Sequence, residues 1–363
     1  MNRIVRIYLI PGAIMQSVMI GGGYGTGREV IEYFTRHGIW EGILGICVAA
    51  ACIAIVFTLS LETSRVFQVF DYRNFFKVLL GPLWFLYEIL GVLLFLLVVA
   101  VIGSAAGTIA QDEFGLHKYA GIGFMLIAVV ILNFYGRAIL TTVLAYWSIF
   151  LYLVFATYLV SVCVSYSDQI ATSLSRPLGD SPWLQSGLQY SFYNITAIPI
   201  ILYAARGIET RSEAVGAGVI GALLAVIPAM MLHITFASDY PAVLSAELPV
   251  YYIFNDLNMN WLKMLYLIVL FGTFIETGAG NIQGFIERLD GWRMEKAGIP
   301  FSRITHATVA GIAVILAAVL SSAGIISLIA DGYGTLAWGF LAVYVVPLLT
   351  IGVYRIIKAT AQT

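Results

Sequence analysis

The chain has 363 residues, of which 60% are apolar and 11% are charged, whereas an ordinary soluble domain is roughly 45–50% apolar and 25% charged. This composition excludes a water-soluble enzyme, and the net charge of −1 provides no basic surface for nucleic acid. We therefore expect an all-α polytopic membrane protein whose partner is the lipid bilayer.

Ten apolar runs, separated by short clusters of charge, glycine and proline, predict ten transmembrane helices. The runs cover residues 4–35, 39–61, 82–110, 119–136, 138–166, 187–210, 212–237, 261–286, 304–322 and 334–357. A polar connection at 168–186 separates five runs from five. This predicts a single transmembrane domain over 1–363, with a first repeat of about 1–166 and a second of about 187–357.

The lysine and arginine residues predict the orientation of the chain, because they concentrate near helix ends on the cytoplasmic side. Of the 19 such residues, 14 fall on the side of both termini and 5 on the other side. We therefore expect a multi-pass protein of the cytoplasmic (inner) membrane with both termini in the cytoplasm. Two connections are also expected to be helical: 65–80 along the inner surface and 246–257 over the outer mouth.

The first run contains a glycine-rich stretch, with five glycines among residues 21–27. Such a stretch disfavours a continuous helix, and non-helical backbone at membrane depth persists only where it is buried in protein or lines a watery cavity. The glycines fit neither a dinucleotide loop nor a Walker loop, but close helix packing through their four-residue spacing is an alternative. Thr26, Arg28 and Glu29 follow directly, and Glu29 suits capping of the half-helix and ligand contact equally well.

The sixth run has a second signal for an interruption. Pro199 lacks an amide hydrogen and disfavours helix at the residue before it, while Asn194 and Thr196 offer side-chain partners for loosened backbone. The residues from Asn194 to Ala197 are therefore expected to depart from a regular helix, and a simple proline kink is the alternative.

The eighth run contains a carboxylate, Glu276, midway along its length. An ionised residue at the bilayer centre costs roughly 2.5–3.5 kcal/mol, so it should face a cavity or a partner. Thr273 and Thr277 are four residues apart and share one helical face. Their hydroxyls are candidates for ion binding, and bonding back to carbonyls of their own helix is the alternative.

Two of these motifs carry a resemblance to a known family. The run from Gly21 to Glu29 resembles the Gly-Ala-Gly-Phe-Ala-Ser-Gly-x-Glu signature of the YkvI-like group of bacterial membrane proteins, and Tyr193-Asn194 resembles the Tyr-Asn pair at the start of that group's second half. The group is similar to the amino acid-polyamine-organocation superfamily. The resemblance implies a LeuT-type fold of two inverted five-helix repeats and secondary transport, and it names no cargo.

The same resemblance implies where an ion would bind, because hydroxyls of the eighth helix join carbonyls of the first helix around sodium in LeuT-type transporters. The expected residues fall into two sets. For the ion they are Ile20, Gly23, Thr273, Glu276 and Thr277, and for the substrate they are Gly22, Gly23, Tyr24, Gly25, Thr26, Glu29, Tyr193, Asn194, Thr196 and Glu276.

Together these features predict a secondary active transporter that moves a small amino-acid-like or zwitterionic solute by alternating access. A sodium or proton gradient would drive it, since the chain has no ATP-binding loop, and no other cofactor or catalytic residue is expected. An ion channel or metal-ion transporter with a carbonyl-lined site, or a membrane sensor, remains the alternative. Neither a metal nor an oligomeric state is assigned by the sequence.

Overall fold

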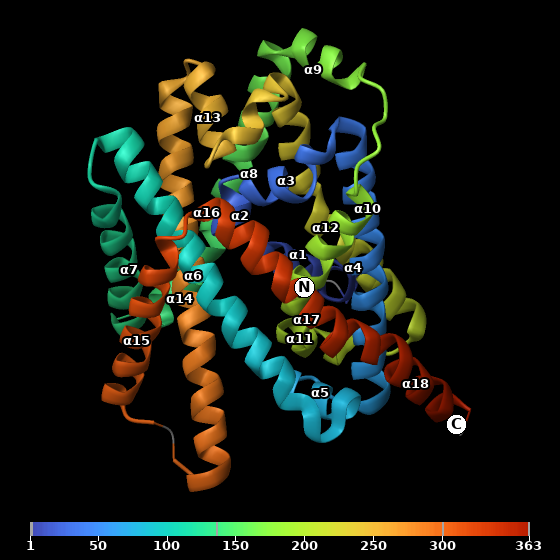
Figure 1. Ribbon diagram of the computed structural model, residues 1–363. Helices are drawn as coiled ribbons and strands as arrows, with labels where there is room; N and C mark the ends of the chain where they lie inside the picture. Colours follow the sequence, from blue (N-terminus) through green and yellow to red (C-terminus); the bar gives the residue numbers. More distant parts are fainter. Residues whose placement is uncertain (1–2, 136, 300, 362–363) are drawn as a thin grey trace.

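The computed structural model describes residues 3–135, 137–299 and 301–361, and these residues form helices and loops without any strand (Figure 1). Six helices among them are long and apolar enough to cross a membrane, or seven if the bent pair Phe150–Ser165 and Ser167–Leu174 forms one span. Each of the ten predicted runs coincides with helical structure. The all-α membrane fold is therefore confirmed, while the number of ten spans stays a prediction.

The first predicted helix is interrupted twice. Helix α1 (Ile10–Met19), preceded by a wide turn η1 (Val5–Leu9), ends where the backbone leaves helical geometry at Gly21, with φ −106° and ψ −161°. The short helix α2 (Gly22–Gly25) follows, and α3 (Arg28–Tyr33) begins after Gly27. Gly27 has a φ of +84°, a left-handed conformation that costs a residue with a side chain about 1–2 kcal/mol. The glycine-rich stretch thus produces the expected break.

The sixth predicted helix is also irregular, at the expected place. Helix α10 (Trp183–Asn194) tightens into a 3₁₀ turn, η4 (Ile195–Ala197), before α11 (Ile198–Ile201) and a second 3₁₀ segment, η5 (Leu202–Gly207), complete the run. Pro199 lies in the first turn of α11, where its missing N–H has no intrahelical acceptor to lose. The interruption therefore precedes the proline.

The central contacts of the bundle join helices of the first half to helices of the second half. Helix α4 (Ile39–Phe67) packs along α12 (Arg211–Phe236), α1 packs on α12, and α10 packs on α4. The first helix of each half thus contacts the second helix of the other half, as two related repeats would. Glycines allow the closest approaches: a methyl group at Gly12 would lie 2.7 Å from the Cα of Gly221, and one at Gly187 would lie 2.5 Å from the carbonyl oxygen of Gly45.

A second set of helices packs together beside this core (Figure 1). Helix α6 (Phe85–Phe114) packs against α7 (Lys118–Tyr135) and α15 (Arg303–Ser321), while α14 (Asn260–Ala297) packs against α7 and α8 (Arg137–Ser165). In Figure 1 the long helices α6 and α14 run beside the interrupted segment α2, and α2 contacts both of them. This arrangement leaves the break of the first helix facing α6 and α14.

Both expected connecting helices are present. Helix α13 (Pro249–Asp256) lies within 246–257, and α5 (Tyr72–Leu80) lies within 65–80, where the Asp71 carboxylate accepts a capping bond from the Asn74 N–H at 2.9 Å. The remaining elements are η2 (Thr35–His37), η3 (Gly81–Trp84), α9 (Ser167–Leu174), η6 (Ala237–Asp239), η7 (Ala242–Ser245), α16 (Ile325–Ser327), η8 (Leu328–Tyr333), α17 (Gly334–Phe340), η9 (Leu341–Val345), η10 (Leu348–Gly352) and α18 (Val353–Thr360).

Candidate functional site

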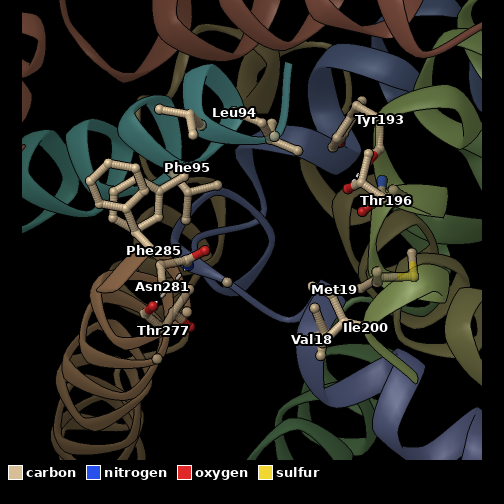
Figure 2. A pocket seen from close by; sticks show the side chains of 18 of the residues that line it. Val18, Met19, Leu94, Phe95, Tyr193, Thr196, Ile200, Thr277, Asn281 and Phe285 are labelled. Atoms are coloured by element: carbon tan, nitrogen blue, oxygen red, sulfur yellow. Dashed lines mark hydrogen bonds between the residues drawn. The ribbon is translucent and has the colours of Figure 1, made fainter. Parts of the chain in front are cut away.

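A cavity of about 220 Å³ lies beside the break of the first helix. Its wall combines the end of α1 and the glycines that follow it with the first half of α6, the irregular part of the sixth helix and the second half of α14. Figure 2 shows Phe95 of α6 close to Phe285 of α14, with Tyr193 and Thr196 across the cavity from Thr277. Both interrupted helices therefore contribute to one cavity.

Glu29 is the carboxylate on this wall, and its side chain is almost fully enclosed, with 4% of the residue exposed. Its Oε2 accepts a hydrogen bond from the hydroxyl of Tyr193 at 2.6 Å, which joins α3 to α10. A methyl group at position 23 would collide with the Glu29 carboxylate. Gly23 is thus required for the close approach of the carboxylate to α2, as well as for the freedom of the backbone.

Tyrosine rings surround this carboxylate. The Tyr193 ring centroid lies 5.4 Å from that of Tyr33, 5.7 Å from that of Tyr190 and 5.0 Å from that of Tyr333. The Tyr33 hydroxyl donates to the carbonyl of Ile329 at 3.1 Å. The cluster packs α3, α10 and η8 together and closes the cavity on the side of α3.

Beyond this cluster, the segment that carries α13 is tied to the first helix. Arg28 is 5% exposed, donates to the carbonyls of Leu244 and Ala246 at 2.9 and 3.0 Å, and pairs with Glu32 at 3.0 Å. The Val250 N–H also donates to the Thr26 carbonyl at 3.1 Å. The bond from Val250 satisfies the Thr26 carbonyl at the interruption, and all these contacts together hold α13 over this side of the cavity.

Helix α13 is anchored to α6 and α14 by a second polar cluster. The Tyr251 hydroxyl donates to Glu113 at 2.5 Å, and Lys263 donates to the same carboxylate oxygen at 3.0 Å. Burial and the neighbouring Glu113 carboxylate raise the pKa of Tyr251 to about 12, so its hydroxyl keeps its proton at neutral pH. The closure over the cavity is therefore polar and fully bonded at this point.

The opposite end of the cavity has a looser arrangement. Arg288 of α14 lines the wall there, with a guanidinium nitrogen 3.8 Å from a Glu88 oxygen and the guanidinium carbon 4.8 Å from the centre of the Tyr72 ring. The Tyr72 hydroxyl donates to Glu88 at 3.4 Å. A separation of 3.8 Å is an ion pair without a good hydrogen bond, so among the described residues Glu88 holds the Arg288 guanidinium only loosely.

Nine of the ten expected substrate residues divide into two groups by position, and the tenth, Glu276, is not among the residues that line the cavity. Those on the cavity wall are Gly22, Glu29, Tyr193, Asn194 and Thr196. Gly23, Tyr24, Gly25 and Thr26 lie buried behind the wall: the Gly25 carbonyl accepts from the Tyr266 hydroxyl at 3.2 Å, and the Thr26 hydroxyl donates to the Gly23 carbonyl at 2.9 Å. Their direct contact with a substrate stays a prediction.

The expected ion residues are dispersed. Thr277 lines the cavity, and a methyl group at Gly21 would lie 3.4 Å from its Cγ2 and 4.0 Å from its hydroxyl. Thr273 is 3% exposed and donates to the Val269 carbonyl of its own helix at 2.9 Å, the alternative considered above. Ile20 is buried behind the wall, and Glu276 is not among the residues that line the cavity. An ion-binding role for these residues stays a prediction.

Sequence reasoning missed part of the α14 wall. Gly280, Asn281, Gly284 and Arg288 line the cavity together with Thr277, and their spacing of three and four residues is that of one helical face. This periodicity would have found them, but no single residue of the series stands out as Glu276 does. Within the residues searched, no cluster of three or more His, Cys, Asp or Glu side chains suits a metal ion.

A helical bundle whose first and sixth helices are interrupted beside one shared cavity defines a membrane protein of the LeuT-type fold. No family model matches the chain. The chain is 24% identical over 307 residues to the uncharacterized membrane protein YkvI of Bacillus subtilis (strain 168), over 79% of this chain and 82% of that protein. This similarity confirms the resemblance to the YkvI-like group.

Solved structures share the fold. A Na⁺-coupled sialic acid symporter superimposes with a TM-score of 0.63 at 14% identity, covering 94% of this chain and 78% of that one. MhsT, solved in complex with L-phenylalanine, gives 0.57 at 14% identity, covering 99% and 98%. The manganese transporter of Eremococcus coleocola gives 0.54 at 13% identity, covering 97% and 94%. At such identities the likeness establishes the fold alone.

Proposed function

We propose that this protein is a secondary active transporter that carries a small amino-acid-like or other zwitterionic solute by alternating access, driven by a sodium or proton gradient. The observation that carries the proposal is the cavity itself, which is built from both interrupted helices and contains the buried carboxylate Glu29. Membrane proteins tolerate irregular backbone only where protein or a watery cavity satisfies it. The sialic acid symporter and the manganese transporter, two of the solved structures with a similar fold, are transporters by their names, which supports this proposal.

We assign the structure to an inward-facing state. The side closed by Arg28 and α13 is the outer side, and the end lined by Arg288 opens to the cytoplasm, because 14 of the 19 lysine and arginine residues are expected on that side. With this orientation we propose that both termini lie in the cytoplasm, in a protein of the inner membrane. A solute would leave the cavity past the loosely paired Arg288 and Glu88.

The wall offers a zwitterion two kinds of partner. Glu29 accepts hydrogen bonds and attracts an ammonium group, while the N–H of Gly22 at the start of α2 and the side chain of Asn194 provide polar contacts for a carboxylate. Thr196 is half-buried on the same wall. An ion bound between the break and Thr277 would lie beside this site, and it would couple ion occupancy to the geometry of the break.

The test is uptake by purified protein in liposomes. A thermal-shift screen against amino acids and amines, with and without sodium, selects a solute, and uptake of that radiolabelled solute is then followed under imposed sodium or proton gradients. Saturable uptake against the solute gradient, abolished when the ion gradient is collapsed, is expected. Flux linear in solute concentration would favour a channel, and binding without flux would favour a sensor; either result contradicts the proposal.

Two matched threonine variants make this test specific to the cavity. Thr196 and Thr157 both donate to a carbonyl of their own helix, at 2.6 and 2.8 Å, but Thr157 is exposed on the outside of α8. Thr196→Val should raise the KM for uptake, because it removes a hydroxyl from the wall, whereas Thr157→Val should leave uptake unchanged. Equal effects of the two variants would place the solute elsewhere.

A further inference from the structure

We propose that Glu29 is the site at which this transporter binds and releases the coupling proton, with the surrounding tyrosines as its hydrogen-bonding cage. The inference rests on the proposed function and makes it more specific, because it selects the proton from the two coupling ions. It follows from the burial of Glu29, the groups that face it and the helices that its hydrogen bond joins.

Among the described residues, no fixed positive charge lies beside the Glu29 carboxylate. Glu29 is 4% exposed, and an ionised carboxylate at membrane depth is costly unless a charge or several donors compensate it. In the part of the chain that the structure describes, its side chain is stabilised by the Tyr193 hydroxyl and the Tyr24 backbone, and no basic side chain interacts with it. The nearby cation, Arg28, is directed to Glu32 and to carbonyls of the α13 segment.

The titratable groups around Glu29 are tyrosines. The hydroxyls in electrostatic range of its carboxylate come from α2, α3, α10 and η8, and they belong to Tyr24, Tyr33, Tyr190, Tyr193 and Tyr333. From α6 and α14 the groups that contact the break are Ile102, Leu270 and Thr277, which do not titrate, and a further tyrosine, Tyr266, whose hydroxyl donates to the Gly25 carbonyl at 3.2 Å. Arg288 lines the same cavity, but it is eleven residues beyond Thr277 on α14, roughly 16 Å along the helix.

The positive partner of Glu29 must therefore arrive from the cavity and leave again. A sodium ion bound by the α14 hydroxyls is less favoured by this geometry, because the Thr273 hydroxyl is buried and already bonded to its own helix. A proton needs only the carboxylate and access to water, and the cavity supplies that access.

The hydrogen bond between Tyr193 and Glu29 connects protonation to conformation. An ionised Glu29 accepts strongly from the Tyr193 hydroxyl and so holds α3 against α10, which keeps the outer side closed. A protonated Glu29 is a weaker acceptor and carries a donor of its own, so the bond between the two interrupted helices weakens. Release of the proton to the cytoplasmic cavity would thus accompany closure on the outer side.

Infrared difference spectroscopy tests the protonation without any solute. Protein in liposomes is compared between about pH 5 and about pH 9, in H₂O and in D₂O. We expect a protonated-carboxyl band that shifts in D₂O, is lost in Glu29→Gln and moves in frequency in Tyr193→Phe. Glu62→Gln is the control, because Glu62 is also buried but pairs with Arg65 at 2.7 Å, and this substitution should leave the band in place. A band that survives in Glu29→Gln, or the absence of any band, would overturn the proposal.

Transport separates this inference from the proposed function. Liposomes take up a radiolabelled mixture of protein amino acids with either an inward proton gradient in sodium-free buffer or an inward sodium gradient at equal pH. We expect the proton gradient alone to drive accumulation. Glu29→Gln should lose this accumulation and also bind the solute more weakly, because the same carboxylate faces the ammonium group, whereas Glu62→Gln should retain both. Accumulation driven only by sodium would overturn the inference and leave the transporter proposal standing. If no solute moves, the transporter proposal fails and the infrared result decides the role of Glu29 by itself.

Discussion

The two interrupted helices occupy corresponding places in the two halves, yet they differ in how far the backbone departs from a helix. At Gly21 the first helix reaches an extended conformation, with ψ −161°, and at Gly27 it becomes left-handed. In the sixth helix the residues around η4 keep helical dihedral angles, with φ −60° and ψ −13° at Ile195. The first helix therefore frees peptide groups, whereas the sixth only tightens its turns.

This difference assigns different chemistry to the two helices. Glycine supplies no side chain, so α2 contributes backbone and the space in which Glu29 lies. The sixth helix keeps its side chains, and Tyr193, Asn194 and Thr196 reach the cavity from it. One half of the chain thus contributes a backbone site and the other a side-chain wall, from corresponding positions in the order of the helices.

The largest effect is expected at Gly27, where the first helix depends most on glycine. Gly27→Ala must adopt a φ of +84° and place its methyl group 2.5 Å from the Phe236 ring. Left-handed strain and overpacking together should reduce the free energy of unfolding by about 3 kcal/mol, measured by thermal melting in detergent. The control is Gly123→Ala in α7, where the methyl group meets open space and stability should stay the same or rise slightly. Equal melting of the two variants would mean that the break does not depend on this conformation.

A smaller loss is expected when the end of the first helix that α13 covers is released from the α13 segment. Arg28→Met removes two bonds to carbonyls and leaves Glu32 buried with Arg36 as its remaining partner. We expect a loss of about 2 kcal/mol, less than the roughly 3–5 kcal/mol for a broken buried pair, because Arg36 still compensates Glu32. Arg36→Met is the matched control, since the Arg36 side chain is 52% exposed and a surface pair contributes little. If both variants melt alike, the α13 closure does not depend on Arg28.

The sequence predicted the interruptions better than the walls of the cavity. Glycine and proline act locally, so the break near Gly21 and the loosened turn after Asn194 could be predicted from a few neighbouring residues. The wall formed by α14 depends on the rotation of that helix against its neighbours. Adjacent residues on a helix point about 100° apart. The position of Glu276 midway along the run therefore predicted its depth in the membrane, but not the helical face on which it lies.

The same dependence on tertiary structure explains why Arg288 was not predicted to line the cavity. It lies beyond the predicted end of the eighth span at residue 286, yet α14 continues to Ala297 and brings it to the cavity. The continuation depends on tertiary packing and on helix-forming residues after the apolar run, which hydropathy alone does not register.

A third variant tests the side-chain wall of the sixth helix. Asn194 is 7% exposed and donates to the Tyr190 carbonyl at 2.9 Å. Asn194→Ala should cost about 1 kcal/mol of stability and weaken solute binding in the thermal-shift assay. Asn281→Ala removes an equivalent bond, to the Thr277 carbonyl at 2.8 Å, from the regular helix α14. Because Asn281 is only half-buried, water can replace its bond and its stability loss should be smaller; a larger loss for Asn281 would contradict the contrast between the two walls.

The smallest effect is expected at Pro199, and it decides which residues cause the irregularity of the sixth helix. Pro199 lies in the first turn of α11, and Ile198 before it keeps helical angles of φ −60° and ψ −48°, so the ring neither removes a needed donor nor forces a kink. Pro199→Ala should therefore change the free energy of unfolding by less than about 0.5 kcal/mol and leave uptake intact. If this variant instead lost uptake with unchanged stability, the proline would be the cause of the irregular turn. The contrast between a glycine break in one repeat and side-chain bonds in the other would then be wrong for the sixth helix.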